Sequence, residues 1–227
     1  MQYLDILSAG RLARRGITCL AIALVVSACA TFSKKEEGAV IGAGAGGAIG
    51  AVIGNQTGST TRGAIIGAVV GGVAGTIIGN QMDQQAKELK QNIPGATVAR
   101  IGEGIQVTFA SGLLYDFDSD VLRATSAENL RSLAASLSKY PNTDLLIVGY
   151  TDSEGASDYN LGLSERRAMA VSSFLATQGV TLARLRTAGR GELEPVSKND
   201  TEVGRQLNRR VEVAIFANAG ARVAHGN

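Results

Sequence analysis

Residues 145–152 read Leu-Leu-Ile-Val-Gly-Tyr-Thr-Asp. The first six are apolar on both faces, which is typical of a strand in the interior of a sheet. After a polar loop, apolar side chains recur at helical spacing over residues 159–178, and Gly179 follows them. Because loops at strand ends hold binding groups on a rigid base, Thr151 and Asp152 are candidates for a binding site.

Shorter segments on both sides of this strand and helix predict the rest of one domain over residues 98–217. Residues 125–128, Thr-Ser-Ala-Glu, have the form of a capping box, and the apolar residues of 130–137 form one helical face that ends before Pro141. We expect further strands at residues 105–109, 185–188 and 210–216, and a short apolar run at 113–117. Strands that alternate with helices predict an α/β or α+β fold with a single sheet.

The long helix carries one residue that does not fit its apolar face. Arg167 lies four residues after Leu163 and four before Val171, and both of these belong to the stripe that faces the core. An arginine turned towards a core needs a carboxylate or an anionic ligand beside it. The alternatives are a structural ion pair and a side chain that reaches the surface along its own stem.

Two further polar clusters lie near expected strand ends. Residues 115–120, Tyr-Asp-Phe-Asp-Ser-Asp, are dense in carboxylates and include Asp118. This pattern favours a turn held by aspartate side chains, and it resembles a calcium loop only faintly because it lacks the glycine and the terminal glutamate of an EF-hand. Residues 208–212, Asn-Arg-Arg-Val-Glu, lead into the last strand and include Arg209.

Glycine is concentrated in one part of the chain, since 14 of the 29 glycines fall between residues 38 and 79. Residues 38–56 and 63–81 are a repeat in which 12 of 19 positions are identical, with glycine at every fourth position. That spacing places the glycines on one helix face, where they allow close packing of helices in lipid. We expect a hairpin of two apolar helices over residues 38–80, which either enters the bilayer or self-associates beside it; a flexible spacer is the alternative. The match to G-x-G-x-x-G at residues 42–47 does not indicate dinucleotide binding, because no strand precedes it.

The first 28 residues have the form of a secretory signal, with a basic stretch, a short apolar core and small residues before Cys29. The sequence 26–29, Val-Ser-Ala-Cys, resembles the lipobox of bacterial lipoproteins. That resemblance implies that Cys29 becomes the first mature residue and carries a covalent lipid. Ala30 stands where an aspartate would retain an enterobacterial lipoprotein in the inner membrane, so the resemblance implies the outer membrane.

Charge and the residue inventory exclude several function classes. Without the leader the chain is formally neutral, with 19 basic and 19 acidic residues, so no basic surface argues for nucleic acid as a partner. His225 is the only histidine, and neither a histidine-based triad nor a histidine–cysteine metal cluster can be built from this sequence. We therefore expect no enzymatic activity, no metal and no cofactor other than the lipid on Cys29.

Four segments in fixed order carry a resemblance to a known family: residues 149–152, 160–168, 189–195 and 204–212. Together they resemble the OmpA-like peptidoglycan-binding domain of the OmpA, Pal and MotB type, over roughly residues 105–217. The glycine repeat and the lipobox narrow the resemblance to lipoproteins of the YiaD type. Tyr150 stands where the family commonly has histidine.

The resemblance implies a βαβαββ sheet and binding of diaminopimelate, the amino acid in the stem peptide of peptidoglycan. The side chain of diaminopimelate ends in an ammonium and a carboxylate on one carbon, so an acid and a base can bind it together. The family's key acid falls on Asp152 and its key base on Arg167. Supporting positions of the family's pocket fall on Asn160, Asp118, Arg209 and Thr151.

These observations predict an outer-membrane lipoprotein that binds peptidoglycan and tethers the membrane to the wall. The alternative is an envelope-assembly or remodelling factor, in which the glycine hairpin inserts into the membrane or self-associates and wall binding only positions it. Peptidoglycan and outer-membrane lipid are the expected partners, and the C-terminal domain is expected in the periplasm. The expected segments are a signal peptide at 1–28, a tether at 29–37, the hairpin at 38–80, a linker with one helical piece at 81–97, the wall-binding domain at 98–217 and a tail at 218–227.

Overall fold

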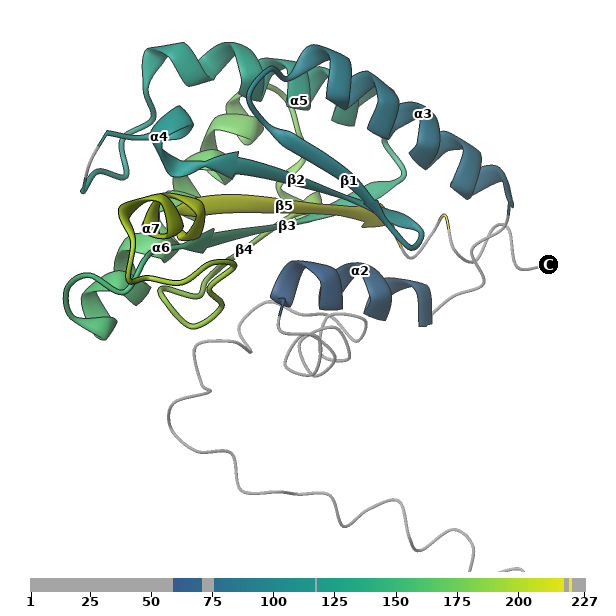
Figure 1. Ribbon diagram of the computed structural model, residues 1–227. Coiled ribbons are helices and arrows are strands. Elements are labelled where there is room, and N and C mark those ends of the chain that lie inside the picture. The colour runs from purple at the N-terminus through teal and green to yellow at the C-terminus, as the bar shows by residue number, and fades with distance from the viewer. Residues whose placement is uncertain (1–58, 71–75, 117, 219–220, 222–227) are drawn as a thin grey trace, which may run out of the picture. The chain divides into compact units, whose positions relative to one another are not determined.

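The computed structural model describes residues 59–70, 76–116, 118–218 and 221. The leader, Cys29 and the first glycine repeat lie outside the described residues. The described chain is a mixed α/β structure, which confirms the expected fold class (Figure 1). Its elements are α2 (Thr60–Val70), α3 (Thr76–Asn92), β1 (Thr97–Ile101), β2 (Gly104–Ala110), α4 (Ser111–Leu114), α5 (Ala127–Lys139), β3 (Thr143–Tyr150), α6 (Ser157–Thr177), β4 (Leu185–Gly189), α7 (Glu202–Asn208) and β5 (Arg210–Ala217).

One five-stranded sheet organises the domain, in the order β1-β2-β5-β3-β4. Strands β3 and β4 are parallel and the other neighbours are antiparallel. The C-terminal strand β5 lies between β2 and β3, with Tyr150 of β3 opposite Arg210. This register brings the loop after β3 and the start of β5 together at the same end of the strands.

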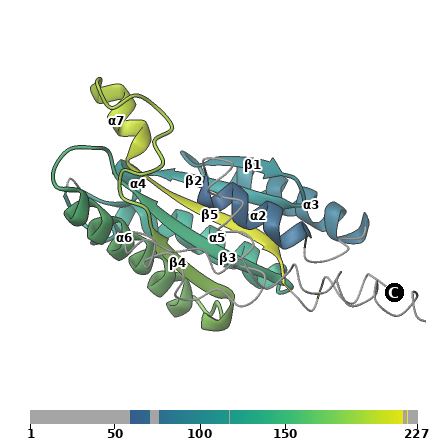
Figure 2. The same cartoon turned by 90° about the horizontal axis from the view of Figure 1, so that it is seen from below.

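The main core lies on the face of the sheet that α3, α5 and α6 cover (Figures 1 and 2). Helix α5 begins where expected, but without the expected capping box. Ala124–Ser126 form a turn of 3₁₀-helix instead. Ser126 is the residue at the start of α5; its Oγ donates to the carbonyl of Arg123 at 2.6 Å, and its side chain accepts no capping bond from the helix.

The linker expected at residues 81–97 is wrong. The middle and end of α3 belong to the core, because Met82, Ala86, Leu89 and Ile93 are all at most 3% exposed. Their spacing of four, three and four residues is that of one buried helical face. The folded domain therefore begins before the boundary expected at residue 98, because α3 precedes that residue and β1 starts at Thr97.

Helix α6 approaches the sheet closely because two strand positions have no side chain. A Cβ at Gly149 would lie 2.0 Å from the carbonyl oxygen of Ser164, and a Cβ at Gly189 would lie 2.3 Å from the Cγ of Glu165. Glycine at these positions lets the helix backbone rest on β3 and β4. The contact fixes α6 against the strand that leads to Asp152.

Helix α2, which contains the start of the second glycine repeat, packs on the opposite face of the sheet (Figure 1). Ile65 is fully buried and forms a small cluster with Ala68, Ala214 and Phe216. It lies directly over Gly104, where a Cβ would be 2.5 Å from its Cγ2. The part of the repeat that lies in α2 therefore packs on the sheet, whereas the sequence suggested a neighbouring helix or lipid.

Polar contacts hold the first turn of α2 at the same face. The backbone N–H of Thr60 donates to Glu194 at 2.9 Å, and the hydroxyl of Thr61 donates to Glu212. Glu212 is 3% exposed and also accepts from Arg210 at 2.6 Å. In the described chain, no helix is both long and apolar enough to cross a membrane.

Candidate binding site

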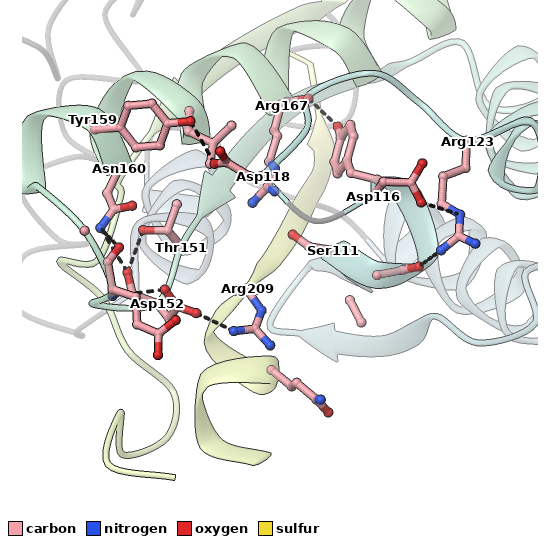
Figure 3. Close-up of a pocket in the computed structure, with 17 residues that line it drawn as sticks. Ser111, Asp116, Asp118, Arg123, Thr151, Asp152, Tyr159, Asn160, Arg167 and Arg209 are labelled. Atoms are coloured by element: carbon pink, nitrogen blue, oxygen red, sulfur yellow. Dashed lines mark hydrogen bonds and ion pairs between the residues drawn. The ribbon is translucent and has the colours of Figure 1, made fainter. Parts of the chain in front are cut away.

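A pocket of about 570 Å³ opens where β3 ends and α6 begins, and α4 and the start of β5 complete its wall (Figure 3). All six residues that the sequence put forward as a binding site line this one pocket: Asp118, Thr151, Asp152, Asn160, Arg167 and Arg209. They come from segments up to about 90 residues apart in sequence, so the fold brings them together.

Asp152 is the buried carboxylate of the pocket, and its residue is 6% exposed. Its Oδ2 forms an ion pair with Arg209, and its Oδ1 accepts from the backbone N–H of Glu154 at 3.1 Å. The preceding Thr151 is also buried, and its hydroxyl donates to the backbone carbonyl of Asp152 at 2.8 Å. Because each carboxylate oxygen has two lone pairs, the Asp152 carboxylate keeps capacity for a further donor.

Arg167 is 3% exposed, so its guanidinium does not reach the surface as a snorkelling side chain would. Its Nε donates to the carbonyl of Ser119 at 2.9 Å, and the guanidinium lies 5.3 Å from the centre of the Tyr115 ring. The Tyr115 hydroxyl donates to the Arg167 carbonyl at 2.6 Å, which fixes the ring against α6.

Among the described residues, no carboxylate lies within the 4.0 Å of Arg167 that would make an ion pair. Burial lowers the pKa of the Arg167 guanidinium, and the nearby acids Asp118 and Asp120 oppose this effect only in part. A structural ion pair therefore does not explain why Arg167 lies inside. Its remaining N–H donors face the pocket.

Arg209 is the partner of Asp152, whereas a direct pair between Asp152 and Arg167 is not formed. Arg209 also binds Glu202 of α7. Desolvation lowers the pKa of Arg209, but the hydrogen bonds to Glu202 and Asp152 raise it by more, so the net shift is upward. Asp152 and Arg209 are thus positioned by each other, and Arg167 takes no part in this ion pair.

Asn160 and Asp118 shape the rim of the pocket. The Asn160 amide donates to the carbonyl of Glu154 at 2.9 Å and to the Glu192 carboxylate at 2.9 Å, so it ties the loop after β3 to α6. Asp118 has a positive φ of 54° and accepts from the Tyr159 hydroxyl at 2.7 Å. This hydrogen bond raises the pKa of Tyr159.

The carboxylates of residues 115–120 do not converge on a metal. Asp116 faces Arg123, Asp118 faces Tyr159, and Asp120 forms an ion pair with Arg166 at 2.7 Å. No group of three possible metal ligands exists in the part of the chain that the structure describes. The faint resemblance to a calcium loop therefore has no counterpart in these side chains.

Several pocket residues were not put forward from the sequence. Ser111, Gly112, Arg123 and Gln206 line the pocket although none of them breaks a local pattern. Tyr159 had a signal, because it is a large aromatic residue at the polar start of α6, and it is 47% exposed there.

Comparison with known proteins identifies the family. A model of the OmpA family matches residues 114–209, and a model of the YMGG-like Gly-zipper matches residues 13–83. The probable lipoprotein YiaD of Escherichia coli (strain K12) is 39% identical over 202 residues, which are 85% of this chain and 92% of YiaD. The chain belongs to the OmpA family.

Other OmpA-family proteins match the C-terminal part. The peptidoglycan-associated lipoprotein of Brucella melitensis is 34% identical over 126 residues, which are 56% of this chain and 74% of that protein. The structure of the cell wall anchor of the type VI secretion system from Pseudomonas aeruginosa has a TM-score of 0.50 and 28% identity, and covers 62% of this chain and 97% of that one. The matches to OmpA-family and glycine-zipper proteins are those that the sequence resemblance led us to expect.

Proposed function

We propose that this OmpA-family protein is a lipid-anchored protein of the outer membrane that binds diaminopimelate in peptidoglycan stem peptides and so holds the membrane to the wall. The observation that carries the proposal is Arg167, a guanidinium buried beside the pocket that forms no ion pair with any carboxylate of the described residues. A buried cation of this kind is costly unless an anion completes it. We assign that anion to the ligand.

Diaminopimelate supplies the matching chemistry at the end of its side chain. Its carboxylate would accept paired hydrogen bonds from Arg167, which a guanidinium forms with good geometry. Its ammonium would donate to Asp152, whose position is set by Arg209. A carboxylate and an ammonium on one carbon would therefore bind a base on α6 and an acid in the loop after β3, respectively.

The anchoring half of the proposal rests on the resemblance around Cys29 and on the relatives. One relative is a probable lipoprotein and another is a peptidoglycan-associated lipoprotein. A structural neighbour is a cell wall anchor. We propose that Cys29 carries the lipid and that the wall-binding domain lies in the periplasm. The proposal assigns no catalytic reaction.

The contact of α2 with the sheet bears on the alternative of a membrane-inserting factor. Ile65 packs on the sheet, and the hydroxyls of Thr60 and Thr61 donate to Glu194 and Glu212, so the start of the second repeat is held against its own sheet. A role in lipid or self-association then falls to the rest of the predicted hairpin, of which residues 38–58 and 71–75 lie outside the described residues.

Pull-down with purified sacculi tests the wall-binding half. The full chain in detergent should sediment with sacculi, and Asp152→Asn should leave most of the protein in the supernatant because the ammonium loses its counter-charge. Asp158→Asn is the matched control, since Asp158 lies exposed on the first turn of α6. Sedimentation of Asp152→Asn at the level of the control would contradict the assignment, and cleared bands in a peptidoglycan zymogram would indicate a hydrolase.

A further inference from the structure

The pocket has a second polar end, which takes no part in the proposed binding of the diaminopimelate side chain by Asp152 and Arg167. Figure 3 shows Asp152 and Arg209 on one side of the pocket and Asp116 and Arg123 on the other, with Ser111 between them. Ser111 begins α4 directly after β2, and its N–H donates to the carbonyl of Arg209 at 2.8 Å. This end is therefore built on the same framework as the Asp152 end.

The hydroxyl of Ser111 is the first sign of a ligand there. Ser111 is 4% exposed and lines the pocket, yet its Oγ makes no hydrogen bond to any residue within the described ranges. Buried polar atoms are almost always hydrogen-bonded, and an exception calls for an explanation. A bound molecule with an amide or carbonyl group would supply the missing partner.

Arg123 is the second sign. Its Nη1 donates to the carbonyl of Gly112 at 2.9 Å, whereas its Nε lies 3.7 Å from the Asp116 carboxylate, which is too long for a hydrogen bond. The Asp116 side chain is 78% exposed and so neutralises Arg123 only weakly. A guanidinium has five N–H donors, so most of those of Arg123 remain for a carboxylate.

The size of the pocket allows both ends to be occupied at once. Its volume of about 570 Å³ falls within the range of roughly 300–1,000 Å³ that holds drug-sized ligands. A single amino acid is smaller than such a ligand. The pocket therefore has room for diaminopimelate together with the adjoining part of the stem peptide.

We infer that Ser111 and Arg123 form a subsite for the C-terminal end of the stem peptide, with Ser111 bonded to a peptide amide group and Arg123 to the free terminal carboxylate. The inference rests on the proposed binding of diaminopimelate at Asp152 and Arg167. Such a subsite makes the protein selective for stem peptides that end in a free carboxylate. That carboxylate belongs to diaminopimelate itself in a tripeptide and to the following alanine in a tetrapeptide.

Calorimetric titration of the full chain in detergent tests the inference with four synthetic probes. These are the stem tripeptide and the stem tetrapeptide, each as the free acid and as the C-terminal amide. We expect one of the free acids to bind at least about tenfold more tightly than its amide, the size expected for a charge-assisted bond. The peptide length at which the difference appears identifies the source of the carboxylate.

Two variants assign the effect to the subsite. Arg123→Gln should bring the free acid to the affinity of its amide, while Arg131→Gln, an exposed control on α5, should leave the difference intact. Ser111→Ala should weaken all four probes without lowering Tm, because it removes a hydroxyl that has no partner in the fold.

The outcomes separate the subsite from the proposed function. If the unaltered chain binds each acid and its amide equally, or if Arg123→Gln keeps the difference, the subsite is wrong although diaminopimelate binding stands. If the unaltered chain binds none of the four probes, the proposed function fails and the subsite fails with it.

Discussion

Replacement of Ile65 by alanine tests whether the second glycine repeat is part of the folded domain. Ile65 is fully buried between α2 and the sheet, whereas the next residue, Ile66, is 36% exposed on the same helix. The two residues have the same chemistry and nearly the same place in the sequence. If α2 packs on the sheet, substitution of Ile65 must destabilise the domain more than substitution of Ile66. If α2 were surrounded by lipid, the two substitutions would have similar effects.

The expected loss of stability in Ile65→Ala follows from the burial of this side chain. Truncation of a buried isoleucine to alanine costs about 2–5 kcal/mol, which combines lost transfer free energy with the cavity that remains. In a domain of this size, each 1 kcal/mol lowers Tm by roughly 2–4 °C, so Ile65→Ala should lower Tm by at least about 4 °C. Ile66→Ala should change the free energy of unfolding by less than about 0.5 kcal/mol, as surface substitutions do.

Thermal unfolding monitored by circular dichroism measures Tm, and amide hydrogen exchange of Thr60–Val70 measures the docking of α2 itself. Faster exchange in α2 together with a lower Tm is the expected result for Ile65→Ala. Equal effects of Ile65→Ala and Ile66→Ala, or no effect of either on Tm and exchange, would refute the packing of α2 on the sheet.

Three further substitutions probe other parts of the account. Gly149→Ala should destabilise the domain by about 1–3 kcal/mol or more and weaken sacculus binding, because its Cβ would lie 2.0 Å from the Ser164 carbonyl and push α6 from β3; an unchanged Tm would contradict this. Gly162→Ala should stabilise the domain by about 0.5–1 kcal/mol in chemical denaturation, since the new methyl meets only the flexible Arg166 side chain and helical glycine is unfavourable. Cys29→Ser should move the protein from the membrane to the soluble fraction, and continued sedimentation with membranes would exclude the lipid as its main anchor.

The sequence predicted the centre of the domain well because burial leaves a periodic pattern there. The apolar strand before Asp152 and the helix that carries Arg167 are both long and regular, and both were located to within a few residues. Arg167 was also recognised as exceptional from its position in the apolar stripe alone. Local pattern and tertiary environment agree in these elements.

A helical piece was expected within residues 81–97, but the packing of α3 in the core was missed because its buried face is narrow. Charged and amide side chains surround the four buried apolar residues in sequence: Met82, Ala86, Leu89 and Ile93. Gln85 is also buried, but as a polar residue it makes the segment look exposed. A segment of that composition indicates a linker when it is judged by polarity. The helix packs on the core because its few apolar residues fall on one side.

The contacts of α2 and of the pocket depend on pairs that are distant in sequence. Thr60 meets Glu194 across 134 residues, and Asp152 meets Arg209 across 57. No local pattern reports such a pair, since it follows from the order of the strands and from which face each helix covers. The resemblance to the OmpA family supplied the pocket residues, but it gave no indication of the Ser111 end.

The central claim is that Arg167 and Asp152 recognise a carboxylate and an ammonium on the same carbon. Calorimetric titration of the full chain with meso-diaminopimelate, with 1,5-diaminopentane and with pimelic acid measures it most directly, because 1,5-diaminopentane lacks both carboxylates and pimelic acid lacks both ammonium groups. The account predicts binding of diaminopimelate alone, its loss in Arg167→Gln, and its retention in Arg166→Gln, whose side chain is 50% exposed. Binding of 1,5-diaminopentane or pimelic acid as tight as that of diaminopimelate, or full binding by Arg167→Gln, would contradict it.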